Sequence, residues 1–247
     1  MGRTLRAALP GAVGVVAVVL LAGCLWADVS YLSGDGLAGR QNGTAGSVQA
    51  QDHLIDRLQG WGPGPNRAAT GRGAYVQTFG TGANVLGVVP GTDLAHEYVI
   101  VGAHYDGQPD ECRSVEPGDL ICNGATDNAT GVAAVLEVGR RLADAPVRQR
   151  RSVILAFWDA EEEGRVGSRH YVANPLVPLS ATVAYVNLDI QGANLRPSIR
   201  NTTFAIGSET GGPTLQQALA AASTASTLDT RPLSLVFGQG RSDHAEF

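Results

Sequence analysis

The stretch Ser152-Val153-Ile154-Leu155-Ala156-Phe157-Trp158-Asp159-Ala160-Glu161-Glu162-Glu163-Gly164 decides the fold, because an apolar run passes directly into a cluster of acids. A run this apolar predicts a strand that is buried on both faces. The acids follow the carboxyl end of that strand, where open α/β sheets bind their ligands. Adjacent carboxylates repel one another unless a cation lies among them, and a metal ion is the simplest such cation. The alternative is a solvated acidic turn.

Strand-like and helix-like segments alternate on both sides of this stretch. Expected strands cover residues 74–79, 84–89, 98–103, 152–158, 182–188, 203–206 and 233–237, and expected helices cover residues 47–58, 131–142, 167–172 and 213–222. Such alternation predicts a largely parallel sheet with helices on both faces. The expected fold class is therefore α/β, a three-layer sandwich built on a mostly parallel mixed β-sheet.

Metal-binding side chains stand at the ends of the expected strands or in nearby loops. They are His104, Asp127, Glu162, Asp189 and, near the carboxyl end of the chain, His244. Each one alone is weak evidence, since a lone histidine is more often structural than a ligand. Together, two imidazoles and three carboxylates form a ligand set that suits Zn²⁺. Five ligands are more than one catalytic zinc needs, and they suit two zinc ions if one carboxylate bridges them.

The same positions carry a resemblance to a known family. The matching segments are His104-Tyr105-Asp106, Asp127-Asn128-Ala129-Thr130-Gly131, Glu161-Glu162 with Gly164 and Gly167-Ser168 behind it, Asn187-Leu188-Asp189, and Ser242-Asp243-His244. In this order they resemble the co-catalytic di-zinc aminopeptidases of the bacterial leucyl aminopeptidase and aminopeptidase Y type. The superfamily of these enzymes also contains the glutaminyl cyclases. The resemblance extends from Ser47 to the carboxyl end and implies a zinc exopeptidase-like fold.

The resemblance implies a role for each candidate ligand. Asp127 would bridge the two zinc ions and would be followed by a cis peptide bond. His104 and Asp189 would complete one zinc site, and Glu162 and His244 would complete the other.

The resemblance also implies catalytic roles for two more acids. Glu161 would be the general base, and Asp106 would hold the second ring nitrogen of His104. The residues themselves support the division of labour between Glu161 and Glu162. Adjacent side chains cannot point the same way from an extended strand end, so one can bind metal while the other takes a proton from water.

The expected function is that of an exported zinc-dependent exopeptidase, best matched by an aminopeptidase. It would use a zinc-bound water to hydrolyse the first peptide bond of substrates with a free amino terminus. One alternative is an acyltransferase of the glutaminyl cyclase type with one zinc. Another is a non-catalytic ectodomain of the same fold. Asp127-Asn128-Ala129-Thr130-Gly131 resembles the peptidase version, and all five ligands are retained, which favours the peptidase.

The amino end has the pattern of an export signal. Arg3 and Arg6 precede an apolar segment at residues 12–21, and Leu21-Ala22-Gly23-Cys24 resembles the bacterial lipoprotein signal. We therefore expect a signal peptide at 1–23, lipid on Cys24, a tether at 24–45 and the catalytic domain at 46–247. The protein would be an envelope lipoprotein on the outer face of the cytoplasmic membrane, or secreted. The alternative is an uncleaved membrane anchor.

The remaining features concern redox state and partners. In an exported protein, Cys112 and Cys122 are expected to form a disulfide, which would stabilise the fold by about 3 kcal/mol on the chain-entropy model. The formal net charge is −5 and no basic cluster stands out, so no nucleic-acid partner is expected. We expect a monomer. The chain ends three residues after His244, whereas family members continue, so the catalytic domain is expected to be truncated.

Overall fold

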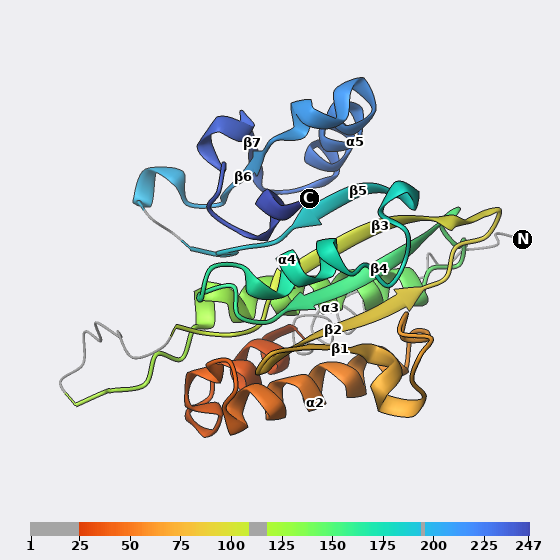
Figure 1. Cartoon of the computed structure of the whole chain (residues 1–247). Coiled ribbons are helices and arrows are strands. Elements are labelled where there is room, and N and C mark those ends of the chain that lie inside the picture. The colour runs from red at the N-terminus through yellow and green to blue at the C-terminus, as the bar shows by residue number, and fades with distance from the viewer. Residues whose placement is uncertain (1–24, 109–117, 194–195) are drawn as a thin grey trace, which may run out of the picture.

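The computed structural model describes residues 25–108, 118–193 and 196–247. A five-stranded sheet in the order β1-β2-β4-β3-β5 forms its centre (Figure 1). The strands are β1 Val76–Phe79, β2 Gly82–Val89, β3 Leu94–His104, β4 Arg151–Trp158 and β5 Thr182–Asn187. β3 runs parallel to both β4 and β5, whereas β2 is antiparallel to both β1 and β4. The sheet is therefore mixed, as the sequence predicts.

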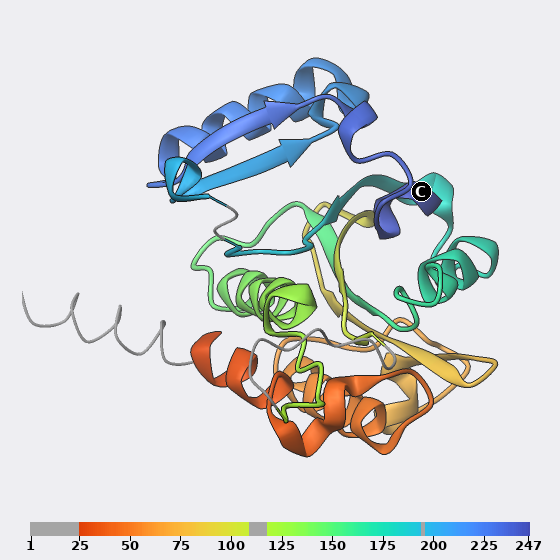
Figure 2. The same cartoon turned by 90° about the vertical axis from the view of Figure 1, so that its left-hand side faces the viewer.

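Helices cover both faces of this sheet, which gives the three layers expected from the sequence. α2 (Ala45–Gln59) and α3 (Thr130–Ala143) lie on one face, and α4 (Val166–Ala173) lies on the other (Figure 2). Short 3-10 helices cover Asp35–Arg40, Gly71–Tyr75, Leu179–Ala181, Pro197–Ile199, Ser208–Gly211, Leu235–Phe237 and Asp243–Glu246.

β4 shows why an unbroken apolar run suits this position. Every residue of the strand after Arg151 is buried. Successive side chains alternate between two apolar clusters: Val153, Leu155 and Phe157 join the cluster under α2 and α3, while Ile154, Ala156 and Trp158 join the cluster that contains Tyr171 of α4. The prediction of a strand buried on both faces is confirmed.

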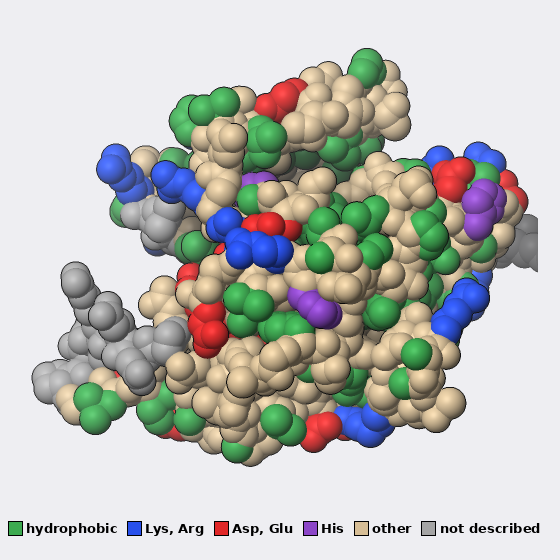
Figure 3. All heavy atoms as spheres, in the orientation of Figure 1, with side chains coloured by type: hydrophobic (Ala, Val, Ile, Leu, Met, Phe, Trp, Pro, Cys, Tyr) green, Lys and Arg blue, Asp and Glu red, His purple; other side chains and the backbone are tan. Residues whose placement is uncertain are grey.

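A smaller unit follows β5. β6 (Thr202–Ile206) pairs in parallel with β7 (Asp229–Leu233) in a separate two-stranded sheet, and α5 (Gly212–Ala225) connects them. The expected strand at 233–237 is wrong. The strand ends at Leu233, and Ser234 then caps a 3-10 turn by accepting a hydrogen bond from the Val236 amide. Val236 is 76% exposed, so this apolar run is not a buried strand. Figure 3 shows several hydrophobic side chains on the surface of this part of the molecule.

The segment before α2 packs against the domain. Residues 25–32 are helical, and Leu32 and Leu37 are buried in the same cluster as the apolar face of α2. Within the expected tether at 24–45, residues 28–40 thus include several that are buried against the domain. The Gly- and Ser-rich composition indicates a flexible chain, but two well-placed leucines bury enough apolar surface to dock it.

Several predictions about the amino end and the cysteines lie beyond the described ranges. The signal peptide at 1–23, Cys24 and Cys112 are outside the described residues, so the lipidation and the Cys112–Cys122 disulfide stay predictions. Within the described ranges, no helix combines the length and the apolar character needed to cross a membrane.

Candidate metal centre

The ends of β3 and β4 bring the candidate residues to one place. The two strands are parallel, and their register sets His104 opposite Trp158. The Tyr105 amide donates to the Trp158 carbonyl at 2.9 Å, which extends the pairing beyond the strands. His104 and the acids that follow Trp158 therefore leave the sheet at the same edge. This is the arrangement that the position of the acids after a buried strand predicts.

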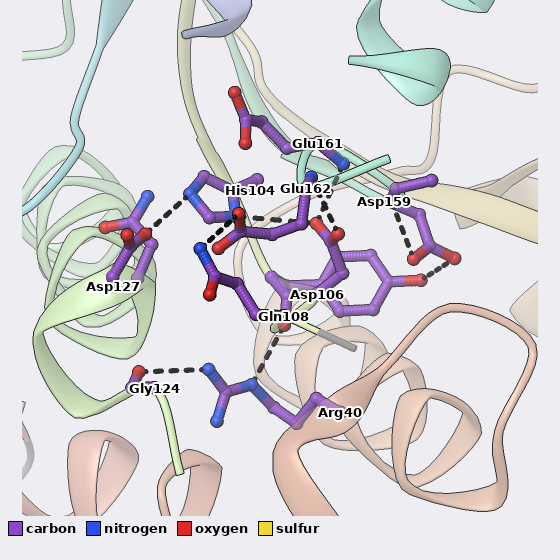
Figure 4. Close-up of polar contacts among 12 residues, drawn as sticks. Arg40, His104, Asp106, Gln108, Gly124, Asp127, Asp159, Glu161 and Glu162 are labelled. Atoms are coloured by element: carbon purple, nitrogen blue, oxygen red, sulfur yellow. Dashed lines mark hydrogen bonds and ion pairs between the residues drawn. The ribbon is translucent and has the colours of Figure 1, made fainter. Parts of the chain in front are cut away.

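His104, Asp127 and Glu162 form a group whose ligand atoms all lie within 4.8 Å of one another (Figure 4). Nε2 of His104 is 3.1 Å from Oδ1 of Asp127 and 3.5 Å from Oδ1 of Asp189. The Asp189 oxygen is buried and has no hydrogen-bond partner among the described residues. An imidazole nitrogen surrounded by carboxylate oxygens is a donor set that suits zinc, so the residues present fit this ion.

Asp106 lies behind the imidazole and is 1% exposed. Its Oδ1 is 3.4 Å from Nδ1 of His104. The same carboxylate accepts hydrogen bonds from the amides of Glu161 at 3.0 Å and Glu162 at 3.2 Å (Figure 4). One buried side chain thus contacts both the ring of the histidine and the turn that carries the two acids, which is how outer partners orient metal ligands.

The turn before α3 presents Asp127. The Asp127-Asn128 peptide bond is cis, as the family resemblance implies. The Asn128 side chain donates to the Leu188 carbonyl at 3.0 Å and accepts from the Gly131 amide at 3.1 Å. The first bond connects the Asp127 turn to the residue after β5, and the second stays within the turn. Asp127 and Asp189 both lie near Nε2 of His104.

Glu161 stands beside the group without belonging to it. Burial raises the pKa of its carboxyl to about 8; the negative charges of Asp243, Asp189 and Glu162 add to this increase, and His104 opposes it. Burial likewise raises the pKa of Glu162. A carboxyl group whose pKa lies near neutral pH can both accept and return a proton, which is the property that a general base needs.

His244 is the one candidate ligand that the structure leaves apart from the others. Its Nε2 is 2.7 Å from the Gly238 carbonyl oxygen. The neighbouring Asp243 is fully buried, and burial raises its pKa to about 7. The structure therefore brings together His104, Asp127 and Glu162, with Asp189 next to them, and holds His244 on the 3-10 turn at the carboxyl end.

The polar contacts of three side chains at the site were not anticipated from the sequence. The Tyr105 hydroxyl is 2.8 Å from Oδ2 of Asp159 and 2.7 Å from the Ala83 carbonyl, which joins the ends of three strands. Gln108 donates to Glu162 at 3.2 Å. Arg40 reaches the site from the docked amino-terminal segment. These contacts join residues that are far apart in the sequence, such as Tyr105 with Asp159 and Arg40 with Tyr105, so no local pattern reveals them.

The metal-free chain should lose stability as the pH rises from about 5 to about 8. Several buried or half-buried groups have folded-state pKa values above their ordinary values, and Glu162 and Asp159 are among them. Three others carry the argument. They are Glu161 at about 8, Asp243 at about 7, and His104, where burial opposes protonation but the carboxylates of Asp106, Asp127 and Asp189 outweigh it. The folded state therefore binds more protons than the unfolded state, and this stabilisation is lost as each group deprotonates.

Thermal unfolding in the presence of a chelator would measure this dependence. The melting temperature should fall across the range, and Glu161→Gln should make the fall shallower. A melting temperature that rises from pH 5 to pH 8 would contradict this electrostatic description of the site.

Comparison with known proteins identifies the family. The model of peptidase family M28 matches residues 84–247 of the 247. The chain is 34% identical over 145 residues to the aminopeptidase NAALADL1 of Mus musculus, covering 54% of this chain and 18% of that protein. It is 28% identical to leupeptin-inactivating enzyme 1 of Streptomyces exfoliatus, covering 89% of this chain and 44% of that protein. The chain thus spans less than half of the length of either relative.

A solved structure supports the fold. The leucine aminopeptidase precursor of Bacteroides thetaiotaomicron superposes with a TM-score of 0.68 at 19% identity, covering 91% of this chain and 80% of that chain. At that identity the likeness concerns the fold. The family match covers the strands β3, β4 and β5 and every candidate metal ligand, from His104 to His244. The chain therefore belongs to peptidase family M28.

Proposed function

We propose that this protein is a zinc-dependent aminopeptidase. The observation that carries the proposal is the group of His104, Asp127 and Glu162 within 4.8 Å, with Glu161 beside it, inside the segment that matches peptidase family M28. Peptides with a free amino terminus are the proposed substrates, because the relatives include proteins described as aminopeptidases.

The residues would divide the chemistry as follows. When bound by these residues, zinc would supply a nucleophilic water at neutral pH and Lewis-acid polarisation of the substrate carbonyl. Glu161 would accept a proton from the attacking water and donate it to the leaving amine. Asp106 would keep the His104 ring in one orientation through Nδ1, 3.4 Å away.

We propose two zinc ions per chain. Asp127 would bridge them, His104 and Asp189 would complete one site, and Glu162 and His244 would complete the other. For the last of these, the His244 ring must give up its contact with the Gly238 carbonyl. That contact joins residues on a single short segment, so the ring can leave it without disturbing the main sheet.

A substrate panel tests the proposed activity. Aminoacyl amides and short peptides should be hydrolysed at the first bond, and the same peptides with an acetylated amino end should be resistant. A chelator should abolish turnover and added zinc should restore it. Equal cleavage of blocked and free peptides would rule out an aminopeptidase. Cyclisation of amino-terminal glutamine with a single bound zinc would favour the glutaminyl cyclase alternative, and no turnover at all would favour the non-catalytic ectodomain.

We also propose that the protein is exported and carries lipid on Cys24, on the strength of the signal at residues 1–24. The Cys112–Cys122 disulfide belongs to the same proposal, because disulfides persist outside the cytoplasm. Mass spectrometry of the amino-terminal peptide from cell envelopes would find a lipidated Cys24; an unprocessed Met1 would exclude this route.

A further inference from the structure

Arg40 is the only arginine among the fully buried side chains of the described residues. Its guanidinium donates to four backbone carbonyls. Nε donates to Tyr105 at 2.9 Å, Nη1 to Leu32 and to Asn123, the latter at 2.8 Å, and Nη2 to Gly124 at 3.1 Å. Arginine is suited to this arrangement because its donors form a rigid planar fork that can hold several acceptors at once.

Three of these four contacts lie next to the candidate metal ligands. The Tyr105 carbonyl belongs to the residue between His104 and Asp106. The Asn123 and Gly124 carbonyls come just before the turn that contains Asp127. Figure 4 shows the contact of Arg40 with Gly124. A single guanidinium thus fastens the end of β3 to the start of the Asp127 turn. Arg40 therefore contacts the backbone beside the ligands and does not contact the ligand side chains in these bonds.

We infer that Arg40 is a positioning residue of the metal centre, which sets the distance between the His104 end and the Asp127 turn before metal binds. The inference rests on the proposed function. It also extends the functional unit to the docked amino-terminal segment, because Arg40 precedes the part of the chain that matches the family.

The backbone around Arg40 is shaped for this contact. A Cβ atom on Gly107 would lie 2.1 Å from the Gly39 carbonyl oxygen, and one on Gly124 would lie 2.8 Å from Nη2 of Arg40. The loop at Gly107 therefore lies closer to the backbone of the amino-terminal segment than a residue with a Cβ atom would allow, and a Cβ atom on Gly124 would crowd the guanidinium. Gly124 also has a φ of 56°, a conformation that favours glycine.

The charge of Arg40 has a role at the site as well. Burial lowers the pKa of Arg40 to about 10, and attraction to Asp106 and Asp127 opposes the decrease. The group therefore stays charged at neutral pH. Its positive charge lies on the backbone side of the acidic cluster and reduces the mutual repulsion of carboxylates that must stay close together when no metal is present.

The amino-terminal segment also contacts the domain through residues other than Arg40. Leu37, three residues earlier, is buried in the main apolar cluster. Nearer the amino end of the segment, the buried Asp28 pairs with Arg57 of α2 at 2.9 Å. Leu37 makes no hydrogen bond to the site through its side chain, so a truncation there loosens the segment while leaving the guanidinium in place. It supplies the matched control.

The test compares Arg40→Met and Arg40→Lys with Leu37→Ala in the full chain. Zinc affinity of the metal-free protein is measured by competition with a chromophoric chelator, at a temperature where every variant is folded. Arg40→Met should bind zinc about 10- to 100-fold more weakly, the range seen when outer partners of metal ligands are lost. A lysine side chain keeps the charge but has only three donors on one nitrogen, so Arg40→Lys should lose a smaller part of the affinity. Leu37→Ala should lower the melting temperature and leave zinc affinity unchanged.

Hydrogen exchange of the metal-free chain gives a second readout that needs no metal. Amide exchange in residues 104–108 and 122–129 should speed up in the Arg40 variants and not in Leu37→Ala. If the unmodified chain binds no zinc, the proposed function fails and the exchange result still decides the role of Arg40. If Arg40→Met does not fold, Arg40→Lys carries the test. Unchanged zinc affinity together with unchanged exchange in these segments would overturn the inference, as would equal zinc weakening by Leu37→Ala.

Discussion

Glu161→Gln should lower kcat by about 10²–10⁴, the usual cost of removing a general base. The glutamine keeps the size and hydrogen-bonding capacity of the side chain but cannot accept the proton. Because Glu161 stands outside the group of His104, Asp127 and Glu162, zinc content should not change. KM should change little, since the lost interaction acts in the transition state. Steady-state kinetics on an aminoacyl amide, with elemental analysis of the same sample, would measure all three quantities.

Glu162→Gln is the matched control, because it alters the adjacent acid in the same turn. Glu162 belongs to the metal group, so this variant should bind zinc more weakly. Loss of zinc by Glu161→Gln with retention by Glu162→Gln would mean that the two roles are reversed. If neither variant slows hydrolysis, the acidic turn after β4 is not the catalytic site.

Asp127→Asn should have the second large effect. Oδ1 of Asp127 is 3.1 Å from Nε2 of His104, and the Asp127 side chain is 42% exposed. As the proposed bridge, it would be shared by both ions, and an amide is a much weaker ligand than a carboxylate. The loss in zinc affinity should therefore exceed the roughly 10- to 100-fold that loss of an outer partner costs. Calorimetric zinc titration and steady-state kinetics would measure the two losses.

Asp144→Asn controls for the removal of one negative charge near the same helix. Asp144 pairs with Arg140 at the far end of α3, and its side chain is 66% exposed. This variant should bind zinc normally. Asp127→Asn should keep a near-normal melting temperature when metal-free, because removing a half-exposed carboxylate from an acidic cluster relieves repulsion. Normal zinc binding by Asp127→Asn would exclude a bridging role.

The positions of the site residues could be predicted where local pattern and sheet geometry agree. The apolar run at 152–158 has no alternation, which indicates a strand covered on both faces, and β4 is such a strand. Once two strands are parallel neighbours, their carboxyl ends share an edge. The closeness of His104 to the acids after Trp158 follows from that rule, and the register of β3 and β4 confirms it.

Other features depend on contacts between distant residues, and no local pattern records them. Arg40 lies in a Gly-rich stretch that is typical of a linker, yet its partners are 65 to 84 residues away for three of its four bonds. The apolar residues after Leu233 favour a strand by composition, but β6 pairs with Asp229–Leu233, which come before them. The position of the His244 ring depends on its contact with the Gly238 carbonyl oxygen. Gly238 lies outside the Ser242-Asp243-His244 motif, so the motif does not predict this contact.

Zinc content of the intact protein tests the central claim most directly. Elemental analysis of metal-loaded protein, after removal of loosely bound ions, should find two zinc ions per chain. Graded removal with a chelator should abolish hydrolysis before the second ion is lost, because each ion is expected to take part in the reaction. One tightly bound zinc with full activity, or no bound zinc at all, would contradict a two-ion centre built on His104, Asp127, Glu162, Asp189 and His244.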